Sequence, residues 1–241
     1  MNNAIHGSVN DSRSIGLRVR EECLSLLLGG TISEALRLSY CGHPAIALKS
    51  LLPKWLTDAV RTDMCADNNW KEEHWVTNQG QDVHLVSQNH FLQAPPSARF
   101  SASDCLRRPC ATSYSVRGFL SALTDLDAAI GLSRVCNETI AFKSADIARY
   151  RQGHYLRRHA DLFEDRRFAI VFFFGDCWQQ GCGGELLVEA SSGVAMAFPP
   201  LEGCVVVMPI RPDFYHQVAV NISDTWIRQS IACHFHLKQN R

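Results

Sequence analysis

Three residues in the second half of the chain have the types and spacing of a mononuclear metal site. His159-Ala160-Asp161 places an imidazole and a carboxylate two residues apart, and side chains at that spacing point to the same side of a strand. His216, in Phe-Tyr-His-Gln-Val, is the best candidate for a further nitrogen ligand. Two histidines and one carboxylate form a set that binds Fe(II) and leaves positions open for reactants. The pattern predicts an iron centre at His159, Asp161 and His216.

Arg228 and Ser230 follow His216 and lie two residues apart in a run that reads as a strand. An iron centre with open positions needs a co-substrate, and a keto acid that chelates the iron carries a distal carboxylate. A buried arginine beside a hydroxyl is the expected anchor for that carboxylate. The order of these residues therefore has a chemical logic. Taken singly, each also fits an ordinary residue, such as a surface histidine, a solvated aspartate or an ion-paired strand arginine.

The elements that must position these residues are short strands. After Gly131 the sequence consists of apolar, β-branched or aromatic runs separated by Gly and Pro. Such runs predict an antiparallel sandwich or barrel rather than alternating strands and helices. The runs cover residues 136–150, 154–159, 168–175, 185–190, 194–198, 204–209, 214–220 and 226–236.

The first half of the chain shows helical periodicity instead. Helices are predicted over 15–28, from a capping box at 31–34 to about Tyr40, from Pro53 onward, and over 115–131 as one continuous helix. A short strand is expected within 44–52. Helices followed by a β core predict the α+β class.

Two segments between these parts are expected to cover the substrate side of the barrel. Residues 70–87 show strand-like runs, and residues 93–113, with Pro95-Pro96 and several Ser and Arg, read as a mobile loop. Polar, mobile loops commonly close over substrates. The alternative is a linker with no catalytic role.

Composition and charge restrict the expected partners. Lys and Arg number 24, as do Asp and Glu, so nothing in the net charge attracts nucleic acid or an anionic membrane. The apolar runs are shorter than the roughly 20 residues that span a bilayer. No secretory signal is evident at the N-terminus, so a cytoplasmic location and reduced cysteines are expected. The oligomeric state is not indicated.

Taken together, the motifs resemble the prolyl 4-hydroxylase-like branch of the Fe(II)/2-oxoglutarate dioxygenases. The resemblance runs from about Ile147 to His236, and earlier residues match only loosely as a helical N-terminal layer. It is carried by Tyr150 to Asp161, the strand Ala169 to Phe174, Trp178, Gly183-Gly-Glu-Leu186, His216-Gln-Val218 and Arg228-Gln-Ser230.

The resemblance implies a double-stranded β-helix (jelly-roll) core at 136–241 and an N-terminal helical and strand layer, with the lid, at 1–135, the two forming one integrated domain. It implies Fe(II), 2-oxoglutarate and O2 as cofactor and co-substrates, with the iron on His159, Asp161 and His216. Arg228 is then the residue that binds the C5 carboxylate of 2-oxoglutarate. The other residues implied to contact 2-oxoglutarate or line its pocket are Tyr150, Ser230, Val218 and Leu186.

The substrate side is less defined. Phe173 stands where some members carry a tyrosine that reaches the co-substrate, and His234 stands where an aromatic residue is common. Phe173, His234 and Arg157 are expected near the substrate, with a hydrogen-bonded core histidine as the alternative for His234. The carboxylate at Asp161 favours hydroxylation over halogenation and leaves desaturation or cyclisation open.

The implied activity is hydroxylation of an unactivated C–H bond in a small amino-acid- or peptide-derived molecule, with release of succinate and CO2. The alternative is a protein hydroxylase, acting on prolyl or other residues with the same chemistry. A metal-free β-barrel binding module is the non-enzymatic alternative.

Overall fold

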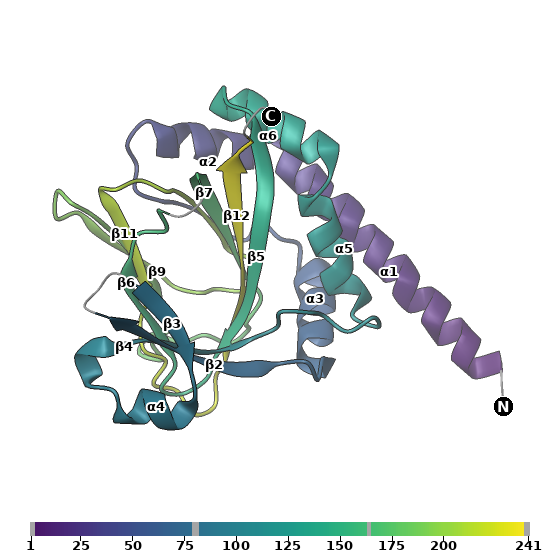
Figure 1. Ribbon diagram of the computed structural model, residues 1–241. Helices are drawn as coiled ribbons and strands as arrows, with labels where there is room; N and C mark the ends of the chain where they lie inside the picture. Colours follow the sequence, from purple (N-terminus) through teal and green to yellow (C-terminus); the bar gives the residue numbers. More distant parts are fainter. Residues whose placement is uncertain (1–2, 79–81, 163–164, 239–241) are drawn as a thin grey trace.

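The computed structural model describes residues 3–78, 82–162 and 165–238 and shows a strongly curved sheet with helices along one side (Figure 1). The helices are α1 (Asn3–Leu28), α2 (Gly30–Tyr40), α3 (Lys54–Ala66), α4 (Gln88–Gln93), α5 (Tyr114–Leu123) and α6 (Leu126–Cys136), with a 3-10 turn η1 (Pro96–Ala98). The strands are β1 (Ile46–Leu48), β2 (Lys71–Asn78), β3 (Asp82–Val86), β4 (Arg99–Cys105), β5 (Ile140–Tyr150), β6 (Tyr155–His159), β7 (Arg166–Phe173), β8 (Leu186–Ala190), β9 (Ala195–Phe198), β10 (Val205–Pro209), β11 (Phe214–Val218) and β12 (Arg228–Leu237).

The strands form a nearly closed antiparallel barrel in the order β1-β10-β7-β12-β5-β4-β6-β11-β8-β9. The β2-β3 hairpin joins this path through pairing of β2 with β4. Strands β5 to β12 fall on the runs predicted after Gly131. The predicted α+β class, with a double-stranded β-helix core and an N-terminal helical layer, is confirmed.

Alternation along β7 separates two apolar cores. Phe168, Ile170 and Phe172 pack against the helices, whereas Ala169 and Val171 point into the barrel. Side chains on a strand alternate between its two faces, and here both faces are covered. This double burial explains why β7 reads as a continuous apolar run rather than an alternating one.

The helical layer includes one close helix crossing. A Cβ built on Gly118 of α5 would lie 2.1 Å from the backbone oxygen of Gly16 in α1. Only glycine therefore allows the two backbones to approach this closely. The crossing seats α1 on α5, and both helices contribute to the core that covers the outer face of β7 and β12.

The single helix predicted over 115–131 is wrong, because the chain forms α5 and α6 with a break between them. Asp125 caps α6, and its side chain accepts a hydrogen bond from the Asp127 backbone N–H. Leu126, which the apolar spacing of one continuous helix would place on the buried face, is 71% exposed. A local capping interaction thus overrides the apolar periodicity.

The mobile loop predicted over 93–113 is also wrong for residues 99–105, which form β4. This strand pairs with β2, β5 and β6 and so bridges the two halves of the barrel. Its sequence is polar, yet Ser101, Ser103 and Asp104 are buried. Arg149 and Arg151 pair with Asp104 and satisfy its charge, which allows a polar segment to form an interior strand.

The remaining predictions concern the short strands, the cysteines, membrane-spanning helices and the division into segments. The strand expected within 44–52 is β1, and the strand-like runs of 70–87 form β2 and β3, although residues 79–81 lie outside the described residues. All ten cysteines are free. In the described part of the chain, no helix has both the length and the apolar character needed to cross a membrane. The division into segments 1–135 and 136–241 stays a prediction.

Candidate active site

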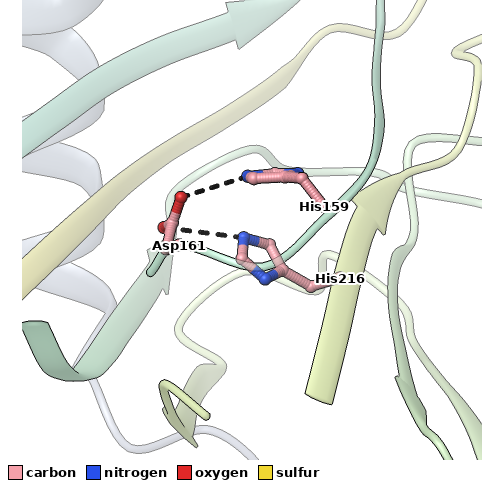
Figure 2. A group of neighbouring side chains, drawn as sticks. All are labelled: His159, Asp161 and His216. Carbon is pink, nitrogen blue, oxygen red and sulfur yellow. Dashed lines mark ion pairs between the residues drawn. The ribbon is translucent and has the colours of Figure 1, made fainter. Parts of the chain in front are cut away.

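His159, Asp161 and His216 meet inside the barrel, as Figure 2 shows. His159 ends β6, Asp161 follows it by two residues, and His216 lies on β11 directly opposite His159 in the strand register. One ligand atom from each residue lies within 4.8 Å of the other two. The fold therefore gathers the three side chains that the sequence pattern singled out.

The charge states of this cluster suit a divalent metal. The Nε2 atoms of His159 and His216 lie 3.2 Å and 3.7 Å from the two oxygens of Asp161. Burial alone would raise the pKa of Asp161, but the neighbouring histidines outweigh it and hold this pKa well below its usual range. Burial, with His159 nearby, lowers the pKa of His216 to about 3. An ionised carboxylate and a neutral imidazole are the forms that bind metals.

The ring of His159 is oriented by the backbone. Its Nδ1 lies 2.8 Å from the carbonyl oxygen of Arg157, so we assign the Nδ1 proton to this bond. The Nε2 lone pair then faces Asp161 and is free to bind a metal. Phe100 packs edge-on against the same ring, with the centroids 5.4 Å apart.

Arg228 is a buried cation that forms no ion pair within 4.0 Å among the described residues. It begins β12, opposite Tyr150 in the register, and is 2% exposed. Its Nε and Nη1 have no hydrogen-bond partner among the described residues. The guanidinium carbon lies 4.9 Å from the ring centroid of Tyr150 and 5.2 Å from that of Phe173. Burial lowers the pKa of Arg228 to about 10, yet the side chain remains charged at neutral pH, so this site fits a carboxylate ligand.

Residues predicted to line the co-substrate pocket are gathered around Arg228. Ser230 lies opposite Phe173 in the register of β12 and β7, and Val218 lies opposite Leu186 in that of β11 and β8. Tyr150 and Val218 share a small apolar cluster. Burial raises the pKa of Tyr150 to about 12, so its hydroxyl keeps its proton and remains a hydrogen-bond donor.

The residues predicted on the substrate side have three different surroundings. Phe173 stacks beside Arg228 in the barrel interior. His234 lies beside the group formed by His159, Asp161 and His216, with its Nδ1 3.6 Å from an oxygen of Asp161. Arg157 donates hydrogen bonds to the carbonyl groups of Pro96 and Ser97. Arg157 therefore attaches the η1 turn to β6.

Asn221 is a site-supporting residue that the sequence reading missed. It is fully buried, and its amide donates to the carbonyl oxygens of Tyr150 and Trp226 at 2.7 Å and 3.1 Å. The connection between β11 and β12 is thus attached to the end of β5. Gly183 packs against this connection, since a Cβ there would lie 1.9 Å from the Val220 oxygen.

Asp146 and Arg166 also lie close to the proposed metal ligands and were not predicted. Asp146 lies 3.2 Å from His234, and Arg166 lies 3.2 Å from Asp161. The spacing of two residues along β5, counted back from Tyr150, could have indicated that Asp146 faces the interior. No comparable signal marks Arg166, because the register between β12 and β7 shifts between Phe168 and Arg166.

A surface hollow of about 170 Å³ on β8, β9 and β11 includes His216 but neither His159 nor Asp161. Its other lining residues include Arg158, Glu189 and Tyr215, which interact with one another on the outside of the barrel. The hollow is therefore not the site built around Arg228 and the metal cluster.

One family model matches the part of the chain that carries the site. Residues 145–236 match the family model described as the 2OG-Fe(II) oxygenase superfamily, and this stretch contains the His-Asp-His cluster and Arg228. The chain therefore contains a segment that matches this superfamily. It is a dioxygenase with a prolyl 4-hydroxylase-like fold, and the family uses Fe(II), 2-oxoglutarate and O2. A search of curated protein sequences finds no significant match.

Solved structures show the same fold at low sequence identity. A Pseudomonas putida prolyl-4-hydroxylase matches with a TM-score of 0.61 and 17% identity, over 86% of this chain and 100% of the other. A Trichoplax adhaerens prolyl hydroxylase, in complex with a peptide fragment of the hypoxia inducible factor oxygen degradation domain, matches with a TM-score of 0.62 and 15% identity. The match covers 85% of this chain and 89% of the other. The α-ketoglutarate-dependent epimerase SnoN from nogalamycin biosynthesis matches with a TM-score of 0.55 and 10% identity, over 86% of this chain and 83% of the other.

Proposed function

We propose that this dioxygenase hydroxylates an unactivated C–H bond of a small amino-acid- or peptide-derived substrate. In the proposed site, His159, Asp161 and His216 hold Fe(II), and Arg228 binds the C5 carboxylate of 2-oxoglutarate. The observation that carries the proposal is the His-Asp-His cluster together with the unpaired buried Arg228 in one barrel. Both halves of the site are needed for an iron enzyme that uses a keto diacid.

When bound, Fe(II) supplies the redox chemistry that couples decarboxylation of 2-oxoglutarate by O2, which yields succinate and CO2, to insertion of one oxygen atom into the substrate. Arg228 orients the co-substrate by pairing with its distal carboxylate. The Tyr150 hydroxyl donates a further hydrogen bond to 2-oxoglutarate, and Ser230 supports the same carboxylate. Val218, Leu186 and Phe173 exclude water from the pocket and so strengthen these polar contacts.

Succinate formation tests this proposal. The purified protein is incubated with Fe(II), 2-oxoglutarate and O2, together with pools of free amino acids, dipeptides and longer peptides. Succinate above the substrate-free background is expected for at least one pool, with a mass increase of one oxygen atom in the substrate. Asp161→Ala is the matched control and should remove the response. An equal response from that variant would refute the assigned chemistry.

A protein hydroxylase is the second candidate. It is favoured by the fold match to the Trichoplax adhaerens enzyme, whose structure holds a peptide fragment. The same assay separates the two functions. Turnover with longer peptides and none with free amino acids or dipeptides would support the protein hydroxylase, and the reverse result would support the small-molecule enzyme.

A further inference from the structure

The two carboxylate oxygens of Asp161 have different neighbours. Oδ1 lies 3.2 Å from Nε2 of His159. Oδ2 lies 3.2 Å from Nη1 of Arg166, 3.6 Å from Nδ1 of His234 and 3.7 Å from Nε2 of His216. Arg166 and His234 are not members of the proposed metal-binding set. Each oxygen therefore faces one proposed ligand, and Oδ2 alone also faces two nitrogen groups outside the proposed set.

His234 is held in its orientation from the opposite side. Its Nε2 lies 3.2 Å from Oδ2 of Asp146, and the other oxygen of Asp146 accepts a hydrogen bond from Arg107 at 2.9 Å. Glu73 in turn binds Arg107 through two hydrogen bonds. His234 as a whole residue is 4% exposed, and its Nδ1 has no hydrogen-bond partner among the described residues. That atom is directed toward Asp161.

We propose that Arg166 and the Asp146–His234 pair hold Oδ2 of Asp161, so that the carboxylate binds the metal through Oδ1 alone. This inference rests on the proposed function and adds positioning residues to it. Groups that hydrogen-bond a metal ligand from behind commonly set its orientation and its affinity for the metal.

The binding mode of Asp161 would determine how many coordination positions of the metal stay open for reactants. Two histidines and a carboxylate that uses one oxygen occupy three positions of an octahedral ion and leave three open. A carboxylate that uses both oxygens would leave two, and chelation by 2-oxoglutarate would then fill them. If Oδ2 is held in this way, a position on the bound metal would remain for O2.

The neighbouring arginine on β7 provides a matched control. Arg167 follows Arg166 directly, points to the other face of the strand and pairs with Glu138 at 3.2 Å. Replacement of either arginine by methionine removes the same charge from the same strand end. Only the change at Arg166 alters the surroundings of Asp161.

Calorimetric titration with Mn(II), and then with 2-oxoglutarate on the Mn(II)-loaded protein, tests the proposal. Arg166→Met and His234→Phe should each weaken Mn(II) binding by about 10–100-fold, whereas 2-oxoglutarate should still bind to the loaded protein. Arg167→Met should bind both like the wild type. Thermal unfolding of the metal-free variants shows whether each one folds.

Conservative changes at His234 separate positioning from packing. In His234→Asn the amide can occupy the place of Nδ1 and face Asp161, so Mn(II) binding should partly recover relative to His234→Phe. In His234→Gln the amide takes the place of Nε2 and faces Asp146, so recovery should be smaller.

Wild-type affinities in both Arg166→Met and His234→Phe would overturn the inference while leaving the proposed function intact. Equal losses in Arg167→Met would also overturn it, because the effect would then be general. Absence of Mn(II) binding in the wild type would overturn the proposed function and this inference together.

Discussion

Replacing Arg228 by methionine should weaken 2-oxoglutarate binding and stabilise the folded protein. Methionine removes the charge and retains much of the packing against Tyr150 and Phe173. Losing a buried charge-assisted pair costs about 2–5 kcal/mol. At about 1.4 kcal/mol per factor of ten, the dissociation constant of 2-oxoglutarate should rise by roughly thirty-fold to several thousand-fold. Mn(II) affinity should stay unchanged, because the charge lies away from the metal ligands.

The same change should stabilise the protein in the absence of 2-oxoglutarate. The pKa of Arg228 falls from 12.5 to about 10 on folding because the site is buried. A depressed pKa in a base means that folding disfavours its charged form. The cost, about 3 kcal/mol from the pKa difference, is fully present below the folded pKa and fades as pH rises toward the unfolded value. Arg228→Met should therefore raise the free energy of unfolding at neutral pH by up to about 3 kcal/mol.

Two measurements check this reasoning. Calorimetry gives the 2-oxoglutarate affinity of the Mn(II)-loaded protein, and urea denaturation gives the free energy of unfolding of the metal-free protein. Arg211→Met is the control, because Arg211 is exposed and pairs with Asp213 outside the pocket. An unchanged 2-oxoglutarate affinity in Arg228→Met, or a comparable loss in Arg211→Met, would refute the assignment of the carboxylate site. Destabilisation of the metal-free Arg228→Met would refute the energetic argument.

Four further substitutions have defined outcomes. His159→Ala and His216→Ala should each abolish measurable Mn(II) binding and succinate formation, because two remaining ligands hold a labile divalent ion poorly; wild-type behaviour in both variants would contradict the metal site. Asn221→Ala leaves two buried carbonyl groups without donors and should lower the free energy of unfolding by about 1–3 kcal/mol for each, which urea denaturation measures. Burial alone would raise the pKa of Asp104, but its two arginine partners outweigh burial and lower it. Its contribution to stability is thus complete above the unfolded pKa of about 4 and is lost as pH falls through the lower folded value; Asp104→Asn should weaken the acid dependence of the unfolding free energy, and an unaltered dependence would contradict this.

Local pattern was sufficient for the residues that share a strand or a strand end. Two-residue spacing places His159 beside Asp161 and Arg228 beside Ser230, and apolar runs mark most strands of the barrel. Those features depend on strand geometry, which every extended segment obeys. The His159–Asp161 pair and an antiparallel sandwich or barrel could therefore be predicted before any contact was known. His216 was a candidate from a separate run, and the double-stranded β-helix followed from the family resemblance.

Tertiary structure decided features whose partners are distant in the sequence. β4 reads as a polar loop because burial of Asp104 becomes favourable only when Arg149 and Arg151 lie beside it. The break between α5 and α6 follows from a cap that competes with an apolar stripe, and local patterns do not show which of the two prevails.

The surroundings of Asp161 also needed the folded chain. Arg166 and His234 approach it from different strands, β7 and β12, and Asp146 approaches His234 from β5. Spacing along one strand determines which face a side chain occupies, but not which side chains of other strands it meets there. The sequence by itself indicated which residue types are proposed to bind the metal. The pairing of strands decided which charged groups surround them, because electrostatic interactions depend on distance in space.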